Sequence, residues 1–221
     1  MKLIKNLPGP LLIFLGALCL SFGGLIVKSF EGASLWQILF WRQFFFSIIV
    51  ALYLLYNYKK NFYKAFYVSG VPGLIGGLAL GIGFVAYVFA MYTTTVANTN
   101  FIITTETIFL ALFGYFFLKE KIDLITFISI ILGMAGVLII LGGSISLQSS
   151  DEFFGNIIAF IMPISFAVLV IIIRKFPNVD MIPAQFSAGV FAGVIGFIIA
   201  GEITISLHDL LLSFLAGFFQ I

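Results

Sequence analysis

The sequence predicts an all-α polytopic membrane protein, a bundle of apolar helices. Of its 221 residues 62% are hydrophobic and only 9% are charged, whereas soluble domains carry roughly 25% charged residues. Apolar runs of about 20 residues recur along the chain, the length that crosses a hydrocarbon core of roughly 30 Å. Basic residues gather in alternate connecting segments, as in membrane proteins of defined orientation. A net charge of +2 gives no basic surface for nucleic acid, so we expect no nucleic-acid partner.

Apolar runs long enough to span a bilayer recur through the whole chain. An eighth run begins near Leu207 and meets the end of the sequence at Ile221 without a polar tail. We therefore expect a longer protein, truncated here within a helix, with further spans beyond it. The seven complete runs cover 10–30, 34–56, 69–91, 95–118, 122–142, 154–173 and 181–200.

The distribution of lysine and arginine predicts the orientation. Lys28 is alone on one side of the predicted membrane, and Arg42 lies inside the second run. Cytoplasmic loops carry the excess of basic residues, so we expect a cytoplasmic N-terminus and a multi-pass protein of the cytoplasmic (inner) membrane. The basic residues on the other side are Lys2, Lys5, Lys59, Lys60, Lys64, Lys119, Lys121, Arg174 and Lys175.

The first two runs carry three candidate substrate-binding residues. Ser21, followed by two glycines, presents either a hydroxyl to a cavity or a packing surface. Trp41 either stacks on a substrate or belongs to the interfacial aromatic belt. Arg42 lies about 10 Å deep, at 1.5 Å per residue, and charged residues at such depth usually face a cavity or a partner.

The third, fifth and seventh runs contain glycines at intervals that let helix backbones approach each other. Tyr87 in the third run either lines a polar cavity or packs between helices. For the glycines, packing alone and a moving or substrate-facing surface both remain open. They are Gly73, Gly77 and Gly81, Gly133 and Gly136, and Gly189 and Gly193.

The fourth run carries a carboxylate, Glu106, near its middle. Such a charge costs a few kcal/mol in a bilayer and normally faces a cavity or an ion partner. On an ideal helix Thr95, Thr99 and Glu106 fall within roughly 40° of one another, and Asn98 widens this polar stripe. At a depth of about 17 Å, Glu106 is expected to share an ion pair or a hydrogen-bond network with Arg42. The pair would bind a zwitterion or couple transport to protons; a structural pair is the alternative.

A faint internal repeat relates the first and sixth runs. Ser21-Phe22 and Ser165-Phe166 each precede a basic residue, a short loop and a new run, at a period of about 145 residues. Five runs separate the copies, so they would be inverted in the membrane. Inverted repeats are typical of alternating-access transporters, with the substrate site where the repeats meet.

Three motifs are informative together: Phe40-Trp41-Arg42, the run from Ala97 to Glu120, and the glycine-bearing segment Gly133 to Gly143. By these motifs the sequence resembles the EamA family of the drug/metabolite transporter superfamily. It implies ten helices in two inverted five-helix halves, of which 10–143 is the first repeat and 153–221 an incomplete second repeat. Thr107 stands where many members have proline, so we expect a less kinked fourth span. Within the run from Ala97, the matching places are Ala97-Asn98, Thr104-Thr105, Glu106-Thr107 and Leu118-Lys119-Glu120.

The resemblance implies secondary transport of a small polar or amphipathic metabolite, such as an amino acid, by a protein embedded in the lipid bilayer. Facilitative and ion-coupled transport both stay open, with the proton as the candidate coupling ion. No GxxxxGK[ST] motif indicates ATP hydrolysis. A lipid-linked sugar flippase, assembled as a homodimer of short chains, stays open. An intramembrane enzyme needs partnered acids, bases or metal ligands, and His208 and Cys19 each stand alone, so we expect no enzyme, cofactor or metal. The predicted substrate-binding residues are Ser21, Trp41, Arg42, Tyr87, Asn98, Thr99 and Glu106.

Overall fold

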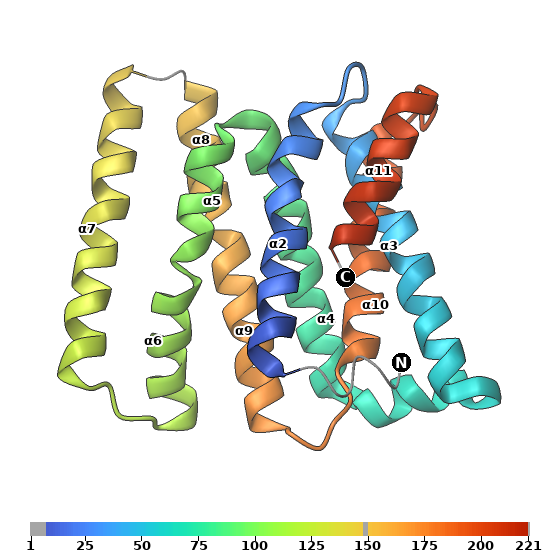
Figure 1. Cartoon of the computed structure of the whole chain (residues 1–221), viewed down its shortest axis with the longest axis horizontal. Helices are drawn as coiled ribbons and strands as arrows, with labels where there is room; N and C mark the ends of the chain where they lie inside the picture. Colours follow the sequence, from blue (N-terminus) through green and yellow to red (C-terminus); the bar gives the residue numbers. More distant parts are fainter. Residues whose placement is uncertain (1–7, 148–149, 221) are drawn as a thin grey trace.

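A computed structural model describes residues 8–147 and 150–220, which fold into a bundle of α-helices (Figure 1). Six helical segments of this part of the chain are long and apolar enough to cross a membrane, which confirms the predicted all-α polytopic fold. The helices are α2 (Gly9–Lys28), α3 (Leu35–Tyr58), α4 (Phe62–Thr93), α5 (Val96–Thr104), α6 (Glu106–Leu118), α7 (Leu124–Leu147), α8 (Ser150–Ala159), α9 (Ile161–Lys175), α10 (Ile182–Ala200) and α11 (Leu207–Phe219).

The helices run up and down, so their connections fall at two ends of the bundle (Figure 1). The α3–α4, α6–α7 and α9–α10 connections lie together at the lower end in this view, and they join the segments that carry most of the basic residues. The α2–α3 and α10–α11 connections lie at the upper end and carry Glu31 and Glu202. Large apolar side chains such as Leu25, Val71 and Ile198 are exposed on the outer surface, as expected of helices that face lipid.

The fourth span is interrupted at Thr105, between α5 and α6. The amide of Thr105 donates to the carbonyl of Ile102, a three-residue bond, and its hydroxyl donates to the same carbonyl at 2.6 Å. The hydroxyl of Thr104 donates to the carbonyl of Phe101. Threonine side chains that bond back to the helix compete with its regular ladder. Neighbouring threonines thus interrupt the fourth span although Thr107 stands in the place of proline, and a smaller kink than in other members stays a prediction.

The sixth span is likewise divided, at Phe160 between α8 and α9. Pro163 has no amide hydrogen to donate to the carbonyl of Ala159, and its ring crowds that carbonyl. The helix therefore ends at Ala159 and begins again at Ile161.

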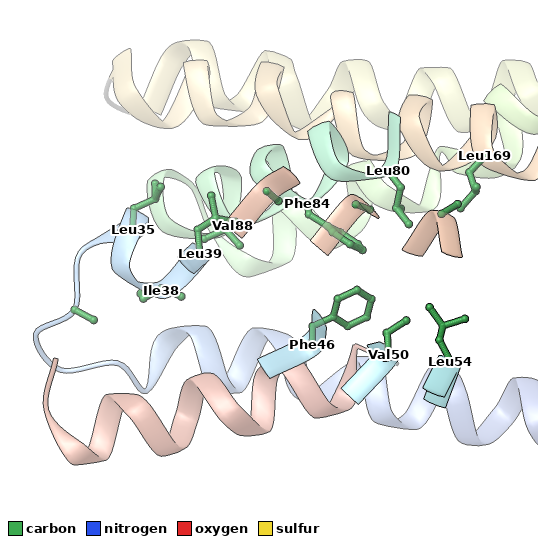
Figure 2. Close-up of a cluster of buried hydrophobic side chains, with 14 of the residues drawn as sticks. Leu35, Ile38, Leu39, Phe46, Val50, Leu54, Leu80, Phe84, Val88 and Leu169 are labelled. Atoms are coloured by element: carbon green, nitrogen blue, oxygen red, sulfur yellow. The ribbon is translucent and has the colours of Figure 1, made fainter. Parts of the chain in front are cut away.

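The hydrophobic core lies where α3, α4 and α10 meet, with α9 beside α4. Phe46, Val50 and Leu54 of α3 lie opposite Leu80 and Phe84 of α4 (Figure 2). Small residues of α10 complete the contact, and glycine allows the close approach. A β-carbon on Gly77 of α4 would lie 2.7 Å from the carbonyl oxygen of Ala184, and one on Gly81 would lie 3.0 Å from that of Ala188.

One buried carboxylate fastens the upper end of the bundle. Asp209, in the first turn of α11, is 1% exposed. Its oxygens accept hydrogen bonds from the amides of Glu31, Gly32 and Ala33 in the α2–α3 connection, at 3.1, 3.2 and 2.9 Å. Ser206 caps the same turn, since its hydroxyl accepts from the amide of Asp209. The side chain thus holds α11 to a loop far away in the sequence.

Candidate functional site

A cavity of about 370 Å³ lies between helices from both ends of the chain. This volume is within the range of small-molecule sites, roughly 300–1,000 Å³. Its walls are largely apolar, and its charged lining residues are Arg42 and Glu106. The lining residues are Cys19, Gly23, Val27, Arg42, Phe46, Leu80, Phe84, Tyr87, Asn100, Ile103, Glu106, Met162, Phe166, Leu169, Gln185, Ala216, Phe219 and Gln220.

Arg42 reaches this cavity from the second turn of α3. The residue is 7% exposed, and its guanidinium carbon lies 4.8 Å from the centre of the Tyr87 ring. A desolvated cation over an aromatic face gains about 2 kcal/mol. Nε and Nη1 are buried and have no hydrogen-bond partner in the described part of the chain. Arg42 is therefore a buried cation with an aromatic neighbour and unused donors.

Glu106 enters the cavity as the first residue of α6. The interruption at Thr105 creates this helix start, and the N-terminus of a helix favours a negative charge. The side chain is partly buried, and it forms no ion pair with Arg42. Within residues 8–147 and 150–220, an ion pair joins Arg174 to Glu120 at 3.1 Å, and Nδ1 of His208 lies 3.2 Å from a carboxylate oxygen of Asp209. Arg42 and Glu106 thus share one cavity without the direct pairing expected from their depths.

Glycines of α2 make room for the aromatic wall. A β-carbon on Gly23 would lie 2.9 Å from the hydroxyl of Tyr87, and one on Gly24 would meet the side chain of Val96. Because Cys19, Gly23 and Val27 recur every four residues, they form one face of α2 and line the cavity together. The pair of glycines after Ser21 therefore brings α2 close to α4 and α5.

The structure brings Arg42, Tyr87 and Glu106 together and leaves the other predicted residues outside the cavity lining. Ser21 lies on the opposite face of α2 from Cys19 and Gly23, and its exposed hydroxyl donates to the carbonyl of Leu18. The indole of Trp41 donates to the carbonyl of Ile203 at 2.8 Å, in the α10–α11 connection.

The polar side chains at the start of the fourth span form hydrogen bonds within their own helix, α5. The hydroxyl of Thr95 accepts from the amide of Asn98 and so caps α5. Thr99 is buried, and its hydroxyl donates to the carbonyl of Thr95. Neither Asn98 nor Thr99 lines the cavity, because Asn100 and Ile103 form the face of α5 that does. The stripe drawn on one ideal helix does not persist through the interruption at Thr105.

Three amide side chains in the lining were missed by the sequence analysis: Asn100, Gln185 and Gln220. Gln220 also accepts a hydrogen bond from Gln43 of α3, at 3.4 Å. Each is an uncharged polar residue in or beside an apolar run. An uncharged polar residue in an apolar run also indicates a cavity, although less strongly than a charged residue does.

Comparison with known proteins identifies the family of the chain. The profile of the EamA-like transporter family matches residues 7–142, more than half of the chain. Neither a curated protein nor a solved structure matches. The matched segment contains Arg42, Tyr87 and Glu106 and the helices from which they reach the cavity. The chain belongs to the EamA-like transporter family, within the drug/metabolite transporter superfamily.

Proposed function

We propose that this chain is a secondary transporter, which moves a small polar or amphipathic metabolite such as an amino acid across the cytoplasmic membrane by alternating access. The observation that carries the proposal is the cavity itself, which combines apolar walls with Arg42, Tyr87 and Glu106. Pockets that are mostly apolar, with a few placed polar groups, are typical of small-molecule sites. The N-terminus and the basic end of the bundle face the cytoplasm in this proposal.

The helix contacts support an inverted repeat. α4 packs against α10 and α9, α11 packs against α3 and α2, and α3 packs against α10. In an inverted repeat, α2 would correspond to α8 with α9, α3 to α10, and α4 to α11. The contact of α4 with α10 then has its counterpart in that of α11 with α3, and the contact of α4 with α9 has its counterpart in that of α11 with α2. The cavity then lies between helices of both repeats, where such transporters bind their substrates.

Glu106 is the proposed proton-coupling group. In proteoliposomes that contain the full chain, counterflow with a mixture of labelled amino acids should reveal transport, and an uncoupler that collapses the pH gradient should lower concentrative uptake. Glu106→Gln should reduce uptake by about tenfold or more, since a hydrogen bond to a charged group contributes roughly 1.5–3 kcal/mol. The residual flux of this variant should not respond to the uncoupler.

Glu120→Gln is the matched control, because Glu120 is exposed and pairs with Arg174 outside the cavity lining. Its uptake should stay close to that of the unmodified chain. Concentrative uptake that is indifferent to the uncoupler in the unmodified chain would contradict proton coupling but not transport. Absence of counterflow for every labelled amino acid would contradict the proposed amino-acid cargo.

A further inference from the structure

We propose that Arg42 binds a carboxylate of the transported molecule, so that the cargo is an organic acid or amino acid with an apolar body rather than an organic cation. This inference rests on the proposed function at one point: it assumes that the ligand bound in the cavity is the transported molecule. It is carried by a buried guanidinium that lines the cavity and has donors without an acceptor among the described residues.

The unmet donors of Arg42 are the first step. A guanidinium stays charged in proteins and carries five N–H donors. Burial of a charge is costly unless the charge is paired and hydrogen-bonded. Nε and Nη1 have no acceptor within the described residues, and no described carboxylate lies within ion-pair distance. The ring of Tyr87 stabilises the cation through its face, but a ring face does not accept the in-plane hydrogen bonds of a guanidinium.

The charge balance of the cavity selects the kind of anion. Arg42 is the basic residue among the lining side chains, and Glu106 adds a negative charge. A doubly charged phosphate would leave excess negative charge in a site of low polarity, where charges interact strongly. A single carboxylate matches the guanidinium, whose planar fork suits carboxylate geometry. An ammonium group on the same ligand would be attracted to Glu106.

The walls define the remainder of the ligand. Phe46, Phe84 and Phe166 line the cavity from α3, α4 and α9. Apolar surface buried against such walls contributes to affinity in proportion to its area. An aliphatic or aromatic body of modest size is therefore expected beside the carboxylate.

A binding role for Arg42 has a signature that a structural role lacks. Arg42→Met removes an unpaired buried charge and keeps most of the side-chain volume. Replacing a buried charge with an apolar residue of similar size is often neutral or stabilising. We expect the melting temperature of this variant to equal or exceed that of the unmodified chain, while carboxylate binding is lost. A fall in melting temperature together with lost binding would assign Arg42 to the fold and overturn the inference.

The test uses three probes with the same ring and different charges: 3-phenylpropionate, L-phenylalanine and phenethylamine. Titration calorimetry on the purified full chain at millimolar probe concentration should detect both carboxylates, with phenethylamine at least about tenfold weaker. Arg42→Met should weaken the carboxylates by about tenfold to a hundredfold. Arg42→Lys keeps the charge without the fork and should retain the preference for carboxylates at reduced affinity. Arg174→Met is the matched control and should bind as the unmodified chain does, because Arg174 pairs with Glu120 outside the cavity lining.

Three binding results would likewise overturn the inference: phenethylamine binding as tightly as the acids, carboxylate affinity unchanged in Arg42→Met, or no carboxylate binding at all. Counterflow of the same probes in proteoliposomes separates this inference from the proposed transport. Arg42-dependent binding of carboxylates without any flux leaves the site assigned and contradicts transport. Flux of the amine alone, or flux independent of Arg42, leaves transport standing and contradicts the carboxylate assignment.

Discussion

Asp209→Ala is expected to destabilise the fold by about 3 kcal/mol or more, because it leaves three backbone amides without their acceptor. A buried donor that loses its partner costs about 1–3 kcal/mol, and Asp209 serves the amides of Glu31, Gly32 and Ala33. Glu31 and Gly32 are exposed, so water would replace part of the loss, whereas Ala33 is buried. Unfolding of the purified chain followed by circular dichroism in mixed micelles measures the effect.

Glu202→Ala is the matched control for this change. Glu202 lies at the same end of the bundle, and its exposed carboxylate accepts from the hydroxyl of Thr204 two residues away. Substitution at such a surface site usually changes stability by no more than about 0.5 kcal/mol. If Asp209→Ala were as stable as Glu202→Ala, the three amide contacts would not hold α11 to the α2–α3 connection.

Gly196→Leu is expected to separate α10 from α3 and to cost about 3 kcal/mol or more. A β-carbon at Gly196 would lie 2.8 Å from the backbone nitrogen of Phe40 and 3.0 Å from the carbonyl oxygen of Trp36. Both atoms belong to the backbone of α3, so no side-chain rotation relieves the overlap. Overpacking in a close-packed interior typically costs 1–3 kcal/mol and occasionally more. Thermal unfolding in detergent and the monodisperse fraction after size exclusion should both fall.

Gly16→Leu is the control, because it makes the same change at a position of α2 that no other described helix contacts. A β-carbon at Gly16 of α2 would lie more than 4 Å from every heavy atom of the other described helices. Leucine should be neutral there or stabilise the helix by up to about 1 kcal/mol, because glycine is a poor helix former. Equal losses in both variants would show that helix propensity or insertion, rather than the contact with α3, determines the outcome.

The sequence predicted the helix bundle well because hydropathy alone defines membrane-length helices. It did not predict the break at Thr105, since the break comes from competition between threonine hydroxyls and the backbone, which is a weaker sequence signal than proline. Pro163 is the stronger kind of signal, in the sixth span. These local interruptions matter because one of them makes Glu106 the first residue of a helix.

Charged residues in apolar runs predicted the cavity lining well, whereas polar residues on the wrong face of a helix did not. Arg42 and Glu106 stand out in apolar runs, and both line the cavity. The hydroxyl of Ser21 makes it a candidate by residue type, although Ser21 lies half a turn away from the face that Cys19 and Gly23 share. The burial of Asp209 depends on amides about 177 residues away in sequence. No local pattern reports such a contact.

The location of Arg42 and Gln43 on α3 also bears on how the protein is made. Gln43 is fully buried, its side chain bonds to Gln220, and its β-carbon lies 3.5 Å from a β-carbon placed on Gly193 of α10. The ribosome completes α3 long before it reaches α10 or α11. During that interval two polar side chains of α3 lack the helices that later enclose them, and an arginine alone costs about 2.5–3.5 kcal/mol at the centre of a bilayer. We therefore expect nascent α3 to stay beside the insertion machinery, and to move fully into lipid only after the late helices emerge.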